Sequence, residues 1–273
     1  MNRPMNELKK YFTFPGPGTG FSLHNHSAWS DGATSARAMC LAARTAGIKR
    51  FGLSDHCVFH PDAATMPVSW SIDLAKLAAY CAELERLKQE LNDENFTLYT
   101  GFEVDFFPEN IGEVLAELEK YPIDYLIGSV HYAGTFPVDH SPVYWEGLTD
   151  DQMDSICRIY WEKIRAAAAC GRFTFLGHLD LPKKFGFLRD PGSYFPDALR
   201  VLDAAAAGGT AIELNTSGWF KPCAEPYPCF NLLREACRRK IPVVVNADAH
   251  FPDQVDRAFP EAFHWLRQAG YPV

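Results

Sequence analysis

The chain has 273 residues, 47% of them hydrophobic, which is enough to bury a sizeable core in one large α/β domain. Its formal net charge of −8 provides no basic surface for nucleic acid or for an anionic membrane. No apolar run reaches the ~18 residues of a membrane span, and no apolar leader precedes Phe14. The eight cysteines include no C-x-x-C pair, which indicates a reducing compartment. We therefore expect a cytoplasmic protein that binds neither nucleic acid nor membranes, and the oligomeric state stays open.

Predicted strands and predicted helices alternate along the chain. Residues 15–20 read PGPGTG, a loop composition, so we expect residues 1–20 to be an N-terminal arm and residues 21–273 one domain. Apolar runs predict strands over 21–26, 49–56, 96–107, 123–131, 173–179, 210–215 and 241–247. Spacings of three and four predict helices over 36–46, 72–91, 111–119, 150–169, 195–207, 230–240 and 260–270. Strands that each lead into a helix favour a parallel sheet.

Histidine and acidic residues gather where the predicted strands end. The signatures read HNH (24–26), SDH (54–56), EVD (103–105), SVH (129–131), GHLD (177–180) and DAH (248–250). Parallel barrels assemble their active sites at this end of the strands. The outer strands of an open sheet lie too far apart for these signatures to meet, so the pattern favours a closed barrel over an open sheet.

The donor types in these signatures indicate metal binding. Side chains alternate between the faces of a strand, so His24 and His26 point the same way and can share an ion. Imidazole and carboxylate donors without thiolates suit Zn, Mn or Fe rather than a cysteine-bound structural zinc. Without metal, so many gathered ionisable groups would repel one another or need costly neutralisation.

These motifs resemble those of the PHP (polymerase and histidinol phosphatase) superfamily. The further segments GSVH (128–131), GHLDL (177–181), IELNTSG (212–218) and EPYP (225–228) are similar to the monofunctional histidinol-phosphate phosphatases. The resemblance covers roughly residues 21–255. It implies a distorted (β/α)7 TIM-like barrel with a metal site at the C-terminal ends of the strands.

The resemblance also implies a ligand set for two or three divalent metal ions (Zn, Mn or Fe). One ion would be held by His24, His26, Glu103 and Asp248, a second by Glu103, His131 and His178, and a third by Asp31, His56 and His250. Glu103 would bridge two ions. Catalysis would then depend most directly on Glu103, Asp248 and His178.

Substrate contacts are sought among polar residues in the loops after the strands. Arg189 and Lys221 are candidates for the phosphate group, and Arg189 is preferred because a guanidinium binds phosphate bidentately. His140 could line the pocket or protonate the leaving group. Asp105 and Glu225 could meet a cationic substrate tail.

The predicted activity is a metal-dependent phosphomonoesterase that removes phosphate from L-histidinol phosphate in histidine biosynthesis. In the expected mechanism a metal-bridging hydroxide attacks the phosphorus in line. A phosphoesterase acting on another small phosphate ester or on nucleotides is the alternative, because the pocket sets specificity. A DNA exonuclease and a metal-binding module without catalysis are further alternatives.

Overall fold

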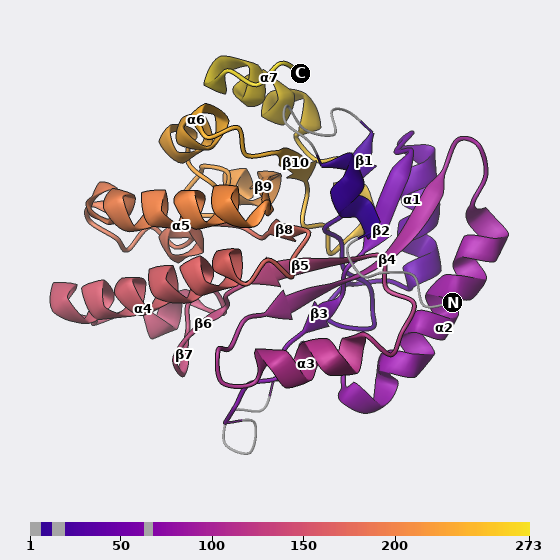
Figure 1. The fold of residues 1–273 in the computed structure, drawn as a ribbon, viewed down its shortest axis with the longest axis horizontal. Helices are drawn as coiled ribbons and strands as arrows, with labels where there is room; N and C mark the ends of the chain where they lie inside the picture. Colours follow the sequence, from indigo (N-terminus) through magenta and orange to yellow (C-terminus); the bar gives the residue numbers. More distant parts are fainter. Residues whose placement is uncertain (1–6, 13–19, 63–67) are drawn as a thin grey trace.

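Parallel strands form the centre of the protein, as Figure 1 shows for this computed structural model, which describes residues 7–12, 20–62 and 68–273. The strands pair in the order β1-β2-β4-β5-β8-β9-β10, with β3 added beside β4. Their bounds are β1 (Phe21–Ser22), β2 (Arg50–Leu53), β3 (His56–Cys57), β4 (Thr97–Asp105), β5 (Tyr125–Ser129), β8 (Phe175–Leu176), β9 (Ala211–Asn215) and β10 (Val243–Asn246). All of these pairings are parallel. The predicted parallel sheet is confirmed.

Segments just beyond β1 and β10 bring the two ends of the sheet together. The backbone N–H of Leu23 donates to Oδ1 of Asn246 at 2.8 Å. Next along the chain, the backbone N–H of His26 donates to the carbonyl of Ala249 at 2.8 Å. The backbone N–H of Ala249 donates to the carbonyl of His24 at 3.3 Å. The sheet is therefore a nearly closed barrel, as expected, although its first strand is much shorter than residues 21–26.

In the described residues, seven α-helices follow the barrel strands, and Figure 1 shows helices lying around them. They are α1 (Ala36–Thr45), α2 (Leu77–Leu91), α3 (Ile111–Leu118), α4 (Asp150–Ala169), α5 (Phe195–Gly208), α6 (Phe230–Arg238) and α7 (Phe259–Ala269). Local sequence sets their starts. Ser35 caps α1, and Thr149 and Gln152 form a capping box at α4. A short hairpin, β6 (Tyr132–Ala133) with β7 (Phe136–Pro137), was not predicted.

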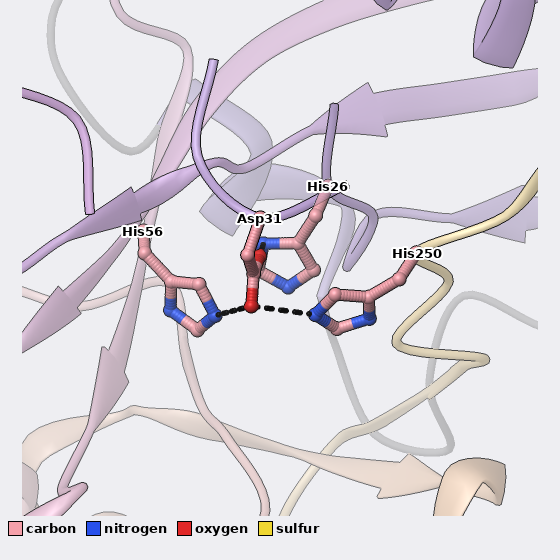
Figure 2. Close-up of side chains that lie close together, drawn as sticks. All are labelled: His26, Asp31, His56 and His250. Atoms are coloured by element: carbon pink, nitrogen blue, oxygen red, sulfur yellow. Dashed lines mark ion pairs between the residues drawn. The ribbon is translucent and has the colours of Figure 1, made fainter. Parts of the chain in front are cut away.

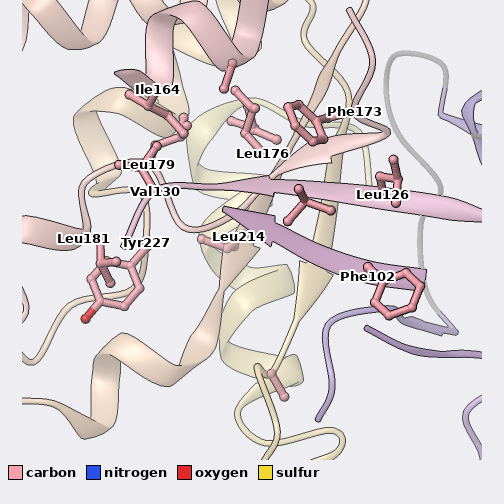
Figure 3. Close-up of a cluster of buried hydrophobic side chains, with 14 of the residues drawn as sticks. Phe102, Leu126, Val130, Ile164, Phe173, Leu176, Leu179, Leu181, Leu214 and Tyr227 are labelled. Atoms are coloured by element: carbon pink, nitrogen blue, oxygen red, sulfur yellow. The ribbon is translucent and has the colours of Figure 1, made fainter. Parts of the chain in front are cut away.

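Strand alternation divides the core into an outer and an inner part. Phe102 of β4, Leu126 of β5 and Leu214 of β9 belong to the large cluster between barrel and helices, part of which Figure 3 shows. Their neighbours Glu103 and Glu213 point to the other side, into the barrel, where both are fully buried. The polar groups at the top of the barrel are thus placed by the same alternation that builds the core.

Apolar side chains fill the N-terminal end of the barrel. The 3-10 helix Glu7–Tyr11 carries Leu8 against this end, and Leu8 is completely buried. The inner cluster contains Leu8, Phe12, Phe21, Leu23, Tyr125, Ile127, Phe175, Ala211 and Val244. Part of the expected N-terminal arm therefore packs against the barrel and closes its N-terminal end.

Three further expectations concern the chain as a whole. The loop expected over residues 15–20 lies, apart from Gly20, outside the described residues. All eight cysteines are free thiols. Within the described ranges, no helix has the length and apolarity required to cross a bilayer.

Candidate metal centre

Glu103, at the C-terminal end of β4, stands at the centre of a cluster of histidines. Its Oε2 lies 2.8 Å from Nδ1 of His56 and 3.1 Å from Nε2 of His24. Its Oε1 lies 2.8 Å from Nε2 of His178 and 3.3 Å from Nε2 of His131. The two oxygens of one carboxylate thus face two different sets of imidazoles, which is the geometry of a bridging ligand.

Asp31 forms a second centre on the open side of the cluster. Figure 2 shows its carboxylate between the rings of His26, His56 and His250. The nearest carboxylate oxygens lie 3.3 Å from His250, 3.6 Å from His56 and 3.8 Å from His26. Asp31 comes from the turn after the first strand, so residues from three separate segments converge here.

Asp248 connects these two centres from the loop after β10. Its Oδ1 lies 3.2 Å from Nε2 of His26 and 3.7 Å from Nε2 of His24. The backbone of Asp248 has a φ of +53°, in the left-handed region that non-glycine residues rarely adopt. Such a conformation costs free energy and occurs most often at functional sites.

Nine side chains in the described residues could hold metal, and they fall into four overlapping groups with ligand atoms within 4.8 Å of one another. The groups are His26, Asp31, His56 and His250; His24, His26 and Asp248; His24, Glu103 and His178; and His56, Glu103 and His131. All nine predicted ligands are therefore brought together. The division among individual ions stays a prediction, since the groups share members and differ from the expected sets.

The donor atoms fit divalent cations because several are buried without a hydrogen-bond partner among the described residues. They include Nε2 of His24, both ring nitrogens of His26, Nδ1 of His56 and Oε2 of Glu103. An unpartnered buried polar atom costs free energy. Bound cations would each accept lone pairs from several of these side chains.

Electrostatics keeps the carboxylates ionised. Burial alone would raise the pKa of Glu103, but the imidazoles of His24, His56 and His131 outweigh it and hold the pKa well below its usual range. For His26, burial and the neighbouring His56 and His250 lower the pKa to about 3, so this imidazole is neutral. Burial would lower the pKa values of His24, His56, His131 and His250, but the neighbouring carboxylates outweigh it and raise them, so a cation that binds these rings would displace protons.

Glu213 supports the cluster from inside the barrel. Its carboxylate lies 3.0 Å from Nδ1 of His24 and accepts the backbone N–H of His178 at 2.9 Å. The side-chain amides of Asn215 and Asn246 donate to it as well. When a cation binds Nε2 of His24, Nδ1 carries the proton and donates it to Glu213.

A pocket of about 420 Å³ opens over the cluster. Two predicted substrate residues, His140 and Lys221, line it. Trp70, Asp139, Tyr227 and Arg257 contribute to its walls. The pocket is large enough for a small organic molecule, and one side of it consists of the candidate metal ligands.

Comparisons with known proteins identify the family of this chain. The model of the PHP domain matches residues 22–217. The chain belongs to the PHP family. A curated protein of Deinococcus radiodurans named "Probable histidinol-phosphatase" is 37% identical over 229 residues, 84% of this chain and 85% of that protein. The Bacillus subtilis histidinol-phosphatase is 28% identical over 211 residues, 69% of this chain and 76% of that protein. The predicted resemblance to histidinol-phosphatases is confirmed.

A solved structure supports the fold. The histidinol phosphate phosphatase of Lactococcus lactis, complexed with zinc, L-histidinol and phosphate, matches with a TM-score of 0.77. The two chains are 21% identical, and the match covers 92% of this chain and 94% of that one. At this identity the likeness concerns the fold alone, and the predicted TIM-like barrel is confirmed.

Three predicted substrate contacts of this PHP protein lie elsewhere. The Arg189 side chain is 82% exposed and forms an ion pair with Asp150 at 2.8 Å, away from the pocket. Glu225 pairs with Lys183 at 2.8 Å and lines a separate cavity. Asp105 is buried and accepts the backbone N–H of His131 at 3.0 Å. Ion pairs thus hold Arg189 and Glu225 outside the pocket, and Asp105 fixes the backbone of the candidate ligand His131.

Several pocket residues were missed by the sequence analysis, among them Trp70 and Arg257. The Trp70 ring stands edge-on to His56, with centroids 4.6 Å apart. Arg257 lies in the loop before α7 and faces the pocket beside Asp248. Both are in loops without a periodic pattern, and only their closeness to the SDH and DAH signatures could have drawn attention to them.

Proposed function

We propose that this protein hydrolyses L-histidinol phosphate to L-histidinol and phosphate as a metal-dependent phosphomonoesterase. The observation that carries the proposal is Glu103, whose two oxygens lie between separate sets of imidazoles at the open end of the barrel. A carboxylate in this position can hold two cations ~3.5–4 Å apart, as hydrolytic two-metal sites require. The 37% identity to a histidinol-phosphatase over most of both chains supports the choice of substrate.

The nine clustered side chains would hold two or three divalent ions, with Glu103 shared between two of them. Zinc is favoured by the Lactococcus lactis relative, and the same donors suit Mn or Fe. When bound, the ions supply a water of lowered pKa and neutralise the phosphate oxygens. His178 and Asp248 keep their ring nitrogen and carboxylate oxygens directed at the reaction centre, and Glu213 keeps His24 in the tautomer that binds metal.

Protein side chains would position the substrate above the ions. Lys221 lines the pocket and places a positive charge where the phosphate oxygens would lie. His140 is at the rim, where its imidazole can donate a proton to the departing alcohol. The protein's net charge of −8 disfavours a nucleic acid partner, and its free thiols agree with a cytoplasmic location.

Phosphate release by the purified protein tests the activity. L-histidinol phosphate, p-nitrophenyl phosphate and AMP are compared, each with chelator and with added Zn, Mn or Fe. We expect strong preference for L-histidinol phosphate and loss of turnover on chelation. Turnover of only AMP or p-nitrophenyl phosphate would overturn the substrate assignment in favour of another phosphoesterase activity, and turnover unaffected by chelation would overturn the metal assignment.

A further inference from the structure

Two basic side chains enter the pocket from neighbouring segments beside Asp248. Lys221 follows the 3-10 helix Thr216–Phe220, and Arg257 lies in the loop before α7. The segments are tied together, because the Thr216 hydroxyl donates to the backbone carbonyl of Arg257 at 2.7 Å. The relative position of the two cations is therefore fixed by the fold.

A third basic residue of the pocket, Lys184, is paired with a carboxylate, whereas Lys221 and Arg257 are not. Lys184 donates to Oδ2 of Asp139 at 3.0 Å and to its carbonyl at 2.7 Å. Neither Lys221 nor Arg257 forms an ion pair with any carboxylate in the described part of the chain. In a protein of net charge −8, two unpaired cations in one pocket indicate a site for an anion.

The Arg257 guanidinium is also held in place. It lies over the ring of Phe220, with its central carbon 4.2 Å from the ring centroid. Its Nε is buried and has no hydrogen-bond acceptor among the described residues. Burial lowers the pKa values of both Arg257 and Lys221, while Asp248 opposes this shift. An anionic ligand in the pocket would compensate these two positive charges.

We propose that Arg257, together with Lys221, forms a subsite for the phosphate dianion that makes this site select phosphate monoesters over diesters. This inference rests on the proposed phosphoesterase function. A monoester brings about two negative charges to the site and a diester brings only one. The planar guanidinium can bind two phosphate oxygens side by side, and its stacking on Phe220 reduces the loss of freedom on binding. A diester would place an uncharged alkoxy group against one of these donors.

The test uses the metal-loaded full-length protein with R257A, R257K and the control R200A. Arg200 lies on α5, is exposed and pairs with Asp197. Binding of inorganic phosphate is measured by calorimetry, and metal content by elemental analysis. We expect R257A to weaken phosphate binding about 10- to 100-fold at unchanged metal content. R257K should recover part of the loss, because it restores the charge without the planar pair of donors, and R200A should match the wild type.

Selectivity is measured with p-nitrophenyl phosphate and bis(p-nitrophenyl) phosphate. In R257A, kcat/KM for the monoester should fall about 10-fold or more, while the diester changes less than about threefold. Unchanged phosphate affinity in R257A would overturn the subsite, and an equal fall for both esters would overturn the selectivity. If diester turnover is too slow to measure, phosphate affinity decides. If R257A weakens phosphate binding but L-histidinol phosphate is not hydrolysed, the subsite stands and the proposed substrate fails.

Discussion

The two ends of the barrel are built from the same strands but have opposite chemistry. At the N-terminal end, apolar side chains including Leu8, Phe12 and Phe175 fill the interior and are almost completely buried. At the C-terminal end, nine titratable side chains crowd together, and several of their buried atoms lack a partner. Burial of apolar side chains stabilises the N-terminal end. The other needs cations before its interactions are satisfied, so metal binding and stability are linked at that end.

The change from one chemistry to the other occurs within single strands. Along β5 the inward positions run from Tyr125 through Ile127 to Ser129, whose hydroxyl donates to Glu103 at 2.6 Å. Along β9 they run from Ala211 to Glu213. Two residues of strand, about 7 Å, separate the apolar interior from the metal-binding layer. Substitutions in the two layers should therefore have separable effects.

Replacing Glu103 with glutamine should have the largest effect. The amide keeps the size of the side chain but loses the charge that can hold two cations, so two ions should be lost together. Metal ions contribute several kcal/mol to phosphoryl transfer, and we expect kcat/KM to fall about 1000-fold or more. The rate of phosphate release and the metal content per protein are the measurements. Full metal content with an unchanged rate would contradict the central role of Glu103.

Replacing Leu8 with alanine should destabilise the N-terminal end of the barrel and leave the metal site unchanged. Leu8 is completely buried in the apolar cluster at the N-terminal end of the barrel, so its truncation should lower the free energy of unfolding by about 2–5 kcal/mol. Urea unfolding measures this loss, and kcat, KM and metal content of the folded protein should match the wild type. The control is Leu41→Ala on α1, where the leucine is 39% exposed and the loss should be smaller. A fall in metal content of the folded Leu8→Ala protein would show that the ends are coupled.

The sequence predicted the C-terminal end of the barrel much better than the N-terminal end. His24, His131 and His178 each follow an apolar run, and strand periodicity is a local property that places all three at the same rim. By contrast, Leu8 and Phe12 stand in a short segment with charged neighbours and no periodicity. Their burial depends on the shape of the finished barrel, which local patterns do not contain.

Glu213→Gln should test whether the layer between the two ends tunes the metal site. The glutamine side chain has one acceptor oxygen where four donors meet the carboxylate, so the hydrogen bond to His24 or that to the His178 N–H is lost. Metal affinity should fall about 10- to 100-fold. Titration with metal measures the affinity, and excess metal should restore most of the activity. Activity that stays low at full metal content would indicate a role beyond positioning His24.

Loop residues were the weakest part of the sequence analysis. Arg189 and Arg257 both follow strands that carry metal ligands, and nothing in their local sequence distinguishes them. In the structure one is paired with Asp150 at the surface and the other is stacked on Phe220 inside the pocket. The direction of a long loop depends on tertiary packing, so the choice between the two arginines required coordinates.

Arg189→Ala should therefore have the smallest effect. An exposed ion pair contributes at most about 1 kcal/mol, and the guanidinium lies outside the pocket, so KM for L-histidinol phosphate should change less than about twofold. Lys221→Ala, which removes an unpaired cation from the pocket, should raise KM about 10-fold under the same conditions. Steady-state kinetics on both variants makes the comparison. A larger KM increase in Arg189→Ala than in Lys221→Ala would mean that Arg189 contacts the substrate, and it would contradict the assignment of Arg189 to the surface.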